Sequence, residues 1–261
     1  MTSIVGGPLA AAAAGAGEAS GQSGAPDPEH YVWRQYILRN GTGPRRLAEY
    51  LQNAAIPALN RIGHAPVGGF EVVAGVPGPT VFLLVPLPTL ASLGDIEAKL
   101  RADQEYMRTA APYLDATAAD PVYVREETAL LAAFPKFPKL ALPAATAGKG
   151  PRLFELRTYE SPTGKAHLAK VRMFSEMGEI EIFKRVGLTP VFFSRTIIGP
   201  RMPSLVYMLV YDNMAAREKS WDAFRNDPEW KKLSATPGFT DAEIVSNITS
   251  VYLRPAAYSQ I

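Results

Sequence analysis

Three side chains on one short segment could together bind an anion or a carbonyl group. Residues 154–159 read Phe-Glu-Leu-Arg-Thr-Tyr, a composition typical of a β-strand. Successive side chains of a strand point to opposite faces, so Glu155, Arg157 and Tyr159 share one face. A guanidinium beside a carboxylate and a phenol can hold an anionic or carbonyl-bearing ligand. A structural ion pair at the edge of the fold explains the same residues, and the sequence leaves both interpretations open.

Two of these residue types recur near the start of the chain. Residues 31–36 read Tyr-Val-Trp-Arg-Gln-Tyr, which gives Arg34 and Tyr36 the spacing of Arg157 and Tyr159. We therefore include Arg34 and Tyr36 among the predicted ligand-binding residues. A position that matters only to folding would recur in the same way.

His167, just after a turn and early in a predicted helix, is a further candidate for ligand binding. The chain has three histidines and no cysteine, and its histidines lack the spacing of metal ligands. A haem would need an axial ligand, and His167 is the one histidine placed to supply it. We expect neither a metal nor a cofactor.

Composition excludes several classes of protein. The lack of cysteine excludes a disulfide scaffold, a thiolate zinc site and a cysteine nucleophile. Hydrophobic residues make up 47% of the 261 residues, as in a globular chain. A net charge of +2 does not indicate a basic surface that would bind nucleic acid, so nucleic acid is not expected as a partner. The sequence contains neither a nucleophile elbow nor a phosphate-binding glycine loop.

The chain repeats itself at an offset of 124 residues. Ten positions of 61–108 are identical to their counterparts in 185–232, among them Arg61/Arg185 and Asp103/Asp227. Apolar segments match as well, since residues 81–85 correspond to 205–209. A fixed offset with this many matches indicates two copies of one unit of about 100 residues.

The second copy predicts the architecture of the unit. Strand patterns occupy 153–160, 190–198, 205–211 and 243–253, and helical patterns occupy 165–185 and 213–233. The order βαββαβ is that of a ferredoxin-like unit, with both helices on one face of a four-stranded sheet. The bare face of each sheet needs a cover, which the other copy can supply. We expect an α+β fold in which two tandem ferredoxin-like units form an intrachain pseudo-dimeric barrel.

This architecture assigns a direction to the strand at residues 153–160. We expect its apolar face, with Phe154, Leu156 and Thr158, to meet the helices. The polar face, with Arg157, would then look into a cavity between the two sheets.

The predicted domains follow from the repeat and from composition. Residues 1–29 contain no Lys or Arg and include an apolar run, which suits an export signal or a disordered Ala/Gly tail. Residues 30–128 form the degenerate first unit, 129–151 a Pro/Ala-rich linker and 152–261 the second unit. We expect an exported or periplasmic protein, with the cytoplasm as the alternative, and no integral membrane segment, because the apolar run is too short.

The second copy resembles the NIPSNAP family. The resemblance covers about residues 152–256 and rests on the Glu-Leu-Arg-Thr-Tyr start and on the helix Trp221-x-x-Phe224-x-x-Asp227-Pro-x-Trp230. The first copy departs from this pattern, because Glu97 and Tyr106 replace the two tryptophans. The family lies in the dimeric α+β barrel superfamily, so the resemblance implies a barrel fold. Together with the internal repeat, it suggests a tandem-repeat, bacterial-type member of the family. The superfamily also includes cofactor-free monooxygenases and haem enzymes.

These observations predict a binding protein. We expect a small apolar or carbonyl-bearing molecule to bind in the cavity between the two sheets, with catalysis left open. A non-catalytic protein-interaction module and a cofactor-free oxygenase-like enzyme are the alternatives. A single chain would complete the barrel as a monomeric pseudo-dimer, and further homo-oligomerisation stays open.

Overall fold

Eight antiparallel strands form a closed barrel. The computed structural model describes residues 27–142 and 151–261, so most of the predicted leader and part of the predicted linker lie outside the described residues. Around the barrel the strands follow the order β1-β3-β2-β8-β5-β7-β6-β4. Their bounds are β1 His30–Leu38, β2 Gly68–Ala74, β3 Thr80–Leu87, β4 Tyr123–Ala133, β5 Leu153–Glu160, β6 Thr189–Ile198, β7 Ser204–Tyr211 and β8 Asn247–Pro255.

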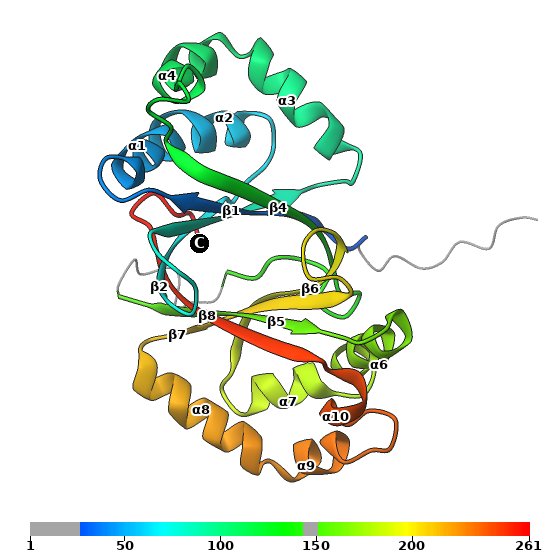
Figure 1. The fold of residues 1–261 in the computed structure, drawn as a ribbon. Coiled ribbons are helices and arrows are strands. Elements are labelled where there is room, and N and C mark those ends of the chain that lie inside the picture. Colours follow the sequence, from blue (N-terminus) through cyan, green and yellow to red (C-terminus); the bar gives the residue numbers. More distant parts are fainter. Residues whose placement is uncertain (1–26, 143–150) are drawn as a thin grey trace, which may run out of the picture.

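Helices cover the barrel on two opposite sides (Figure 1). Over β1–β4 lie α1 (Gly43–Tyr50), the π-helical turn η1 (Leu51–Ala55), α2 (Ile56–Arg61), α3 (Ser92–Ala102) and α4 (Gln104–Leu114). Over β5–β8 lie α6 (Gly164–Ser175), α7 (Glu179–Arg185), α8 (Met214–Asn226), α9 (Pro228–Ser234) and α10 (Asp241–Ile244). Within residues 27–142 and 151–261, every helix is too short or too polar to cross a bilayer.

The two halves of the barrel have the same internal order. The N-terminal half, β1–β4 with its helices, has the strand order β4-β1-β3-β2, and the C-terminal half, β5–β8 with its helices, has the order β8-β5-β7-β6. The halves are joined by pairing of β2 with β8 and of β4 with β6. Each described strand therefore has a neighbour on both sides, and the barrel presents no free sheet edge.

Two element boundaries differ from those predicted. β4 continues to Ala133 because Ala129, Leu131 and Ala133 pack in the barrel core, so the linker predicted for 129–151 begins later than expected. The helix predicted for 165–185 is divided into α6 and α7 at Gly178, whose φ of 93° is left-handed and ends the helical path.

The barrel interior is filled with side chains from both halves. Trp33 stacks on Phe82, with ring centroids 5.0 Å apart, and Phe70 meets Phe154 edge to face at 5.0 Å. The last residue, Ile261, packs into the same cluster, and residues 256–261 bond back to residues 67–69. At one end of the barrel a pocket of only ≈60 Å³ remains between Trp33, Leu156 and neighbouring side chains. Aromatic side chains therefore occupy much of the space between the sheets, where the sequence predicted a cavity.

A repeated cap closes the helical layer of each half. Asp103 is the N-cap of α4 and Asp227 the N-cap of α9, and each side chain accepts from backbone N–H groups of the turn that it caps. Arg61 contacts Asp103 at 2.6 Å, and Arg185 contacts Asp227 at 2.8 Å. Asp103 and Asp227, which match at the repeat offset, therefore have the same structural capping role in the two halves.

Candidate functional site

The polar face of β5 points to the helices, and its apolar face points into the barrel. Phe154 and Leu156 belong to the barrel core, whereas Tyr159 packs with the helices of the C-terminal half. The direction predicted for this strand is therefore wrong. A barrel interior is enclosed by strands on all sides and offers no partner for a charge, while the helix side can supply one.

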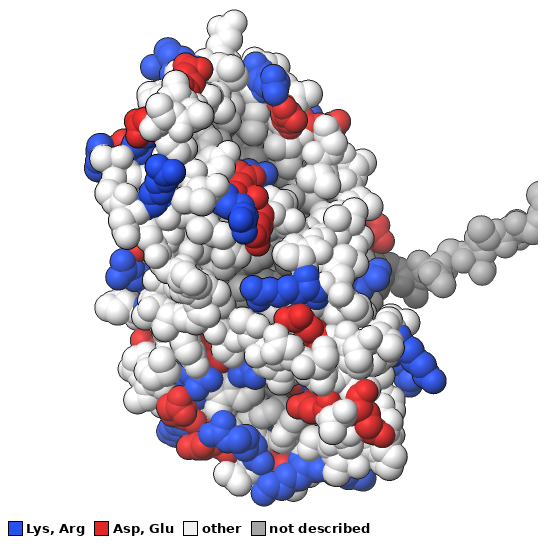
Figure 2. Space-filling model, in the orientation of Figure 1, with Lys and Arg blue, Asp and Glu red and all other residues white. Residues whose placement is uncertain are grey.

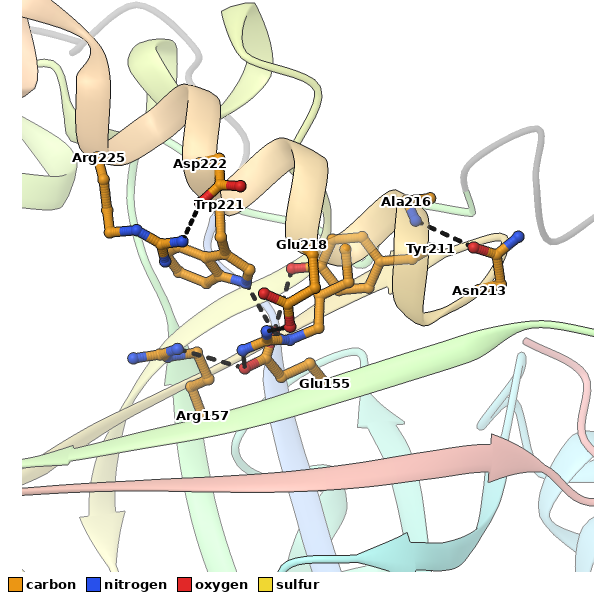
Figure 3. Close-up of polar contacts among 10 residues, drawn as sticks. Glu155, Arg157, Tyr211, Asn213, Ala216, Glu218, Trp221, Asp222 and Arg225 are labelled. Carbon is orange, nitrogen blue, oxygen red and sulfur yellow. Dashed lines mark hydrogen bonds and ion pairs between the residues drawn. The ribbon is translucent and has the colours of Figure 1, made fainter.

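Glu155 is the centre of a buried network beneath α8 (Figure 3). Its carboxylate accepts hydrogen bonds from Arg217 Nη2 at 2.8 Å and from Trp221 Nε1 at 2.9 Å, and Tyr211 donates from 3.2 Å. Burial acts to raise the pKa of Glu155, but the hydrogen bond of Arg217 and the charge of Arg157 outweigh it. The pKa of Glu155 is consequently lowered, and the carboxylate is ionised at neutral pH.

Arg157 is enclosed by groups of the protein. Nη1 donates to Glu155 at 3.2 Å and Nη2 donates to Tyr159 Oη at 3.0 Å. The guanidinium carbon lies 4.5 Å from the ring centroid of Trp221, and 14% of the side chain is exposed. The sequence placed Glu155, Arg157 and Tyr159 together correctly, but here these groups mainly satisfy one another.

Arg34 and Tyr36 lie in the other half, in the wall of a pocket of ≈580 Å³ between the sheet and the helices. The pocket is hereafter the N-terminal pocket. Arg34 Nη1 donates to Tyr36 Oη at 3.3 Å, and Nε lies 3.0 Å from Glu126 on β4. Exposure of the Arg34 side chain is 35%, more than twice that of Arg157. Figure 2 shows a hollow in this half of the molecule, between the helices that Figure 1 labels α3 and α4.

The helices form the remaining walls of the N-terminal pocket. The π-helical turn η1 contributes Leu51 and Ala55, and α3 contributes Leu93, Ile96, Glu97, Leu100 and Arg101. Tyr50 and Tyr106 also line it, and their hydroxyl groups are 3.0 Å apart. None of the residues of α3 is fully buried, and Ile96 and Leu100 are its partly buried side chains that pack against the core.

Smaller side chains explain the open space over Arg34 in the N-terminal half. Arg34 pairs in register with Leu83, whereas Arg157 pairs in register with Tyr207, a fully buried ring. At the repeat offset, the position of Trp221 in α8 is occupied in α3 by Glu97, which points its charge to solvent and pairs with Arg101. The loss of these rings leaves the space over Arg34 open.

Sequence reasoning noted Glu97 in the place of a tryptophan without inferring a pocket from it. The exchange of an aromatic residue for a smaller or charged one at matched positions was the available signal. Leu83, which matches Tyr207 at the repeat offset, is another lining residue that this signal could have identified.

His167 lies on α6 and is buried at 7% exposure. Burial and the charge of Arg195 lower its pKa, so the ring is neutral at pH 7. Among the described residues, no hydrogen bond joins His167 to Glu155, Arg157 or Tyr159. The structure therefore does not bring it into one site with Arg34 and Tyr36, which lie in the other half.

A second charged cluster is buried nearby in the C-terminal half. Lys170 Nζ lies 3.6 Å from Glu179 and 3.2 Å from Asp241, and it faces the rings of Tyr159 and Trp230. Burial raises the pKa of Glu179 to about 7, although Lys170 opposes that shift. In the part of the chain that the structure describes, no group of three or more His, Asp or Glu side chains could hold a metal ion.

Comparison with protein families gives a match in the C-terminal half. The model of the NIPSNAP family matches residues 154–260. No curated protein matches the sequence significantly. A NIPSNAP-like domain protein from Burkholderia xenovorans is 21% identical and covers 42% of this chain and 90% of its own, with a TM-score of 0.37.

Two solved structures match nearly the whole chain. A candidate monooxygenase from Lactobacillus acidophilus is 10% identical and covers 88% of this chain and 94% of its own, with a TM-score of 0.57. A candidate monooxygenase from Fusobacterium nucleatum is 8% identical and covers 88% and 93%, with a TM-score of 0.51. At these identities the likeness concerns the α+β barrel fold alone. Residues 154–260 thus resemble the NIPSNAP family, and they form the C-terminal half of an α+β barrel.

Proposed function

We propose that the protein binds a small, largely apolar molecule in the N-terminal pocket, with Arg34 and Tyr36 contacting its polar group. The observation that carries the proposal is the ≈580 Å³ space with a partly exposed arginine in its wall. Ligand pockets commonly measure about 300–1,000 Å³ and combine apolar walls with a few polar groups. The proposal keeps two residues of the predicted site and moves the ligand from between the sheets to a place between sheet and helices.

The proposal includes the origin of the pocket. The strand orders of the two halves support a tandem duplication of a ferredoxin-like unit. The C-terminal unit has kept its aromatic filling and supports the barrel. The N-terminal unit has lost that filling and would carry the ligand.

Binding suits the lining residues better than catalysis does. Among the residues that line the pocket there is no histidine, and the single carboxylate, that of Glu97, is paired with Arg101. General base catalysis needs a free acceptor beside the substrate. The pocket therefore suits binding, and we propose no monooxygenase activity for it.

A neutral fluorescent probe tests the proposal. N-phenyl-1-naphthylamine is apolar and uncharged, and we expect it to bind the wild-type protein saturably with one site per chain. Glu97→Trp places an indole over the pocket, as Trp221 lies in the other half, and is expected to weaken binding at least tenfold. Asp95→Trp adds the same ring to α3 outside the pocket lining and serves as the matched control.

Probe binding by the two tryptophan variants decides whether the proposal holds. Loss of binding in Glu97→Trp alone supports the N-terminal pocket, provided that thermal unfolding shows both variants to be folded. Absence of saturable binding by the wild type, or equal binding by both variants, would overturn the proposal.

A further inference from the structure

We infer that the ligand of the N-terminal pocket is an amphipathic carboxylate, an anion with an aliphatic body. This inference rests on the proposed function and adds the chemical class of the ligand. It follows from which hydrogen-bonding groups of the wall are already used and from where the apolar side chains lie.

The guanidinium of Arg34 has a donor to spare. Nη1 donates to Tyr36 and Nε faces Glu126. Within the described residues, Nη2 makes no hydrogen bond. In the C-terminal half, Arg157 uses both terminal nitrogens, on Glu155 and on Tyr159. Arg34 therefore retains a charged N–H group that can bind an acceptor entering from the pocket.

Tyr36 offers a second donor beside the first. Its hydroxyl oxygen accepts from Arg34, which leaves its own O–H proton available. Tyr50 and Tyr106 bond to each other, so only one of their two protons is used between them. The wall thus presents several donors, while its one carboxylate is held by Arg101. A group that only accepts, as a carboxylate does, matches such a wall.

Glu126 does not remove the preference for an anion. Its carboxylate lies 3.0 Å from Nε, on the edge of the guanidinium that Nε shares with Nη2, and Glu126 is not among the residues that line the pocket. Nη2 carries a second N–H that points away from that edge. The charges of Glu97 and Arg101 cancel within the lining, so Arg34 supplies the net positive charge there. The acid would meet a cation, while Glu126 keeps Arg34 from being buried without a counter-ion.

The mouth of the pocket favours an aliphatic body. Leu93, Met107 and Leu114 line the pocket and are nevertheless 39–43% exposed. An apolar chain that runs from Arg34 towards these residues would cover them and fill the space beneath α3. The polar end of the ligand would then lie at the sheet and its apolar end at the helices.

Three ten-carbon probes test the charge. Decanoate, decanamide and decyltrimethylammonium have the same chain with an anionic, a neutral and a cationic end. Each is titrated below its micelle concentration against the protein loaded with N-phenyl-1-naphthylamine. We expect decanoate to bind at least tenfold more tightly than decanamide, and the cation to bind most weakly.

Variants of the arginine assign the preference to one residue. Arg34→Gln should reduce the ratio of decanoate to decanamide affinity to about one, and Arg34→Lys should retain part of it. Arg45→Gln removes an exposed arginine of α1 and should leave the ratio unchanged. Amide exchange of residues 92–102 should slow when decanoate binds, because the chain packs under α3.

Two results would overturn the inference. One is equal affinity for decanoate and decanamide in the wild type, and the other is an unchanged ratio in Arg34→Gln. In either case continued binding of the neutral fluorescent probe would leave the proposed pocket standing. Failure of that probe to bind would instead contradict the proposed function itself.

Discussion

The indole of Trp221 lies over the guanidinium of Arg157, with the guanidinium carbon 4.5 Å from the ring centroid. The same ring donates to Glu155, so one side chain covers the cation and satisfies the anion (Figure 3). Arg34 has the matching place in the N-terminal half, where Glu97 stands in the position of the indole. The difference between a filled and an open half therefore depends largely on this position.

Matched truncations should show that difference as stability. Trp221 is 5% exposed and packs against Phe183 and Phe224, so Trp221→Ala is expected to cost about 3–5 kcal/mol. Glu97→Ala should change the free energy of unfolding by less than about 0.5 kcal/mol, because its side chain is exposed. Urea denaturation of both variants measures the two values. Similar losses of stability in the two variants would contradict the view that aromatic packing fills the C-terminal half and is missing over Arg34 in the N-terminal half.

The buried carboxylate of Glu155 should stabilise the fold in a pH-dependent way. Glu155→Gln leaves Arg157 and Arg217 without their shared anion and is expected to cost about 3 kcal/mol at pH 7. The folded-state pKa of Glu155 is lowered, so its contribution is present above the unfolded pKa near 4.5 and is lost as pH falls through the folded pKa. The difference in the free energy of unfolding between wild type and variant should therefore become smaller in acid.

Denaturation curves from pH 7 down to pH 3 measure this gap. Glu160→Gln, on the exposed end of the same strand where Asn247 is its partner, is the matched control and should change little. A gap that stays constant with pH would argue that Glu155 acts by shape alone.

Glu179 should have the opposite pH dependence. Its pKa is raised to about 7 by burial, so the folded state holds a proton that the unfolded state has released. The contribution of this group to the free energy of unfolding is fully present below the unfolded pKa near 4.5. It is lost as pH rises from there through about 7. Glu179→Gln mimics the protonated form and should gain stability over the wild type across this window, by roughly 3 kcal/mol at most.

Stability measured at intervals between pH 4 and pH 8 checks this direction. Lys170 keeps Asp241 as a partner in the variant, 3.2 Å from its Nζ. Glu181→Gln, an exposed change on the same helix, serves as the control. A variant that loses stability relative to the wild type as pH rises would show that Glu179 is ionised beside Lys170.

Much of the fold could be predicted from the sequence, because it depends on patterns that repeat. The period of two placed Glu155, Arg157 and Tyr159 on one face. Periodicity could not say which face is inward, because both faces of β5 are covered and both carry buried residues. That choice depends on Arg217 and Trp221, which arrive from a helix some 60 residues later.

The pocket could not be found by looking for chemical motifs. Arg34 and Tyr36 were predicted as site residues because they recur, yet recurrence alone does not distinguish an open site from a filled one. The distinction lies in residues that do not recur, such as Leu83 opposite Tyr207 and Glu97 opposite Trp221. Their effect appears only when register places them over the arginine.

The covalent barrel has a consequence for how its two halves can change. In a barrel made from two identical subunits, every mutation appears on both sides, and a ring lost to admit a ligand is also lost from the supporting side. Here one gene encodes both sides separately. A cavity-forming substitution in the N-terminal half leaves the aromatic packing of the C-terminal half intact, so one half can acquire new binding properties while the other maintains the stability that this requires.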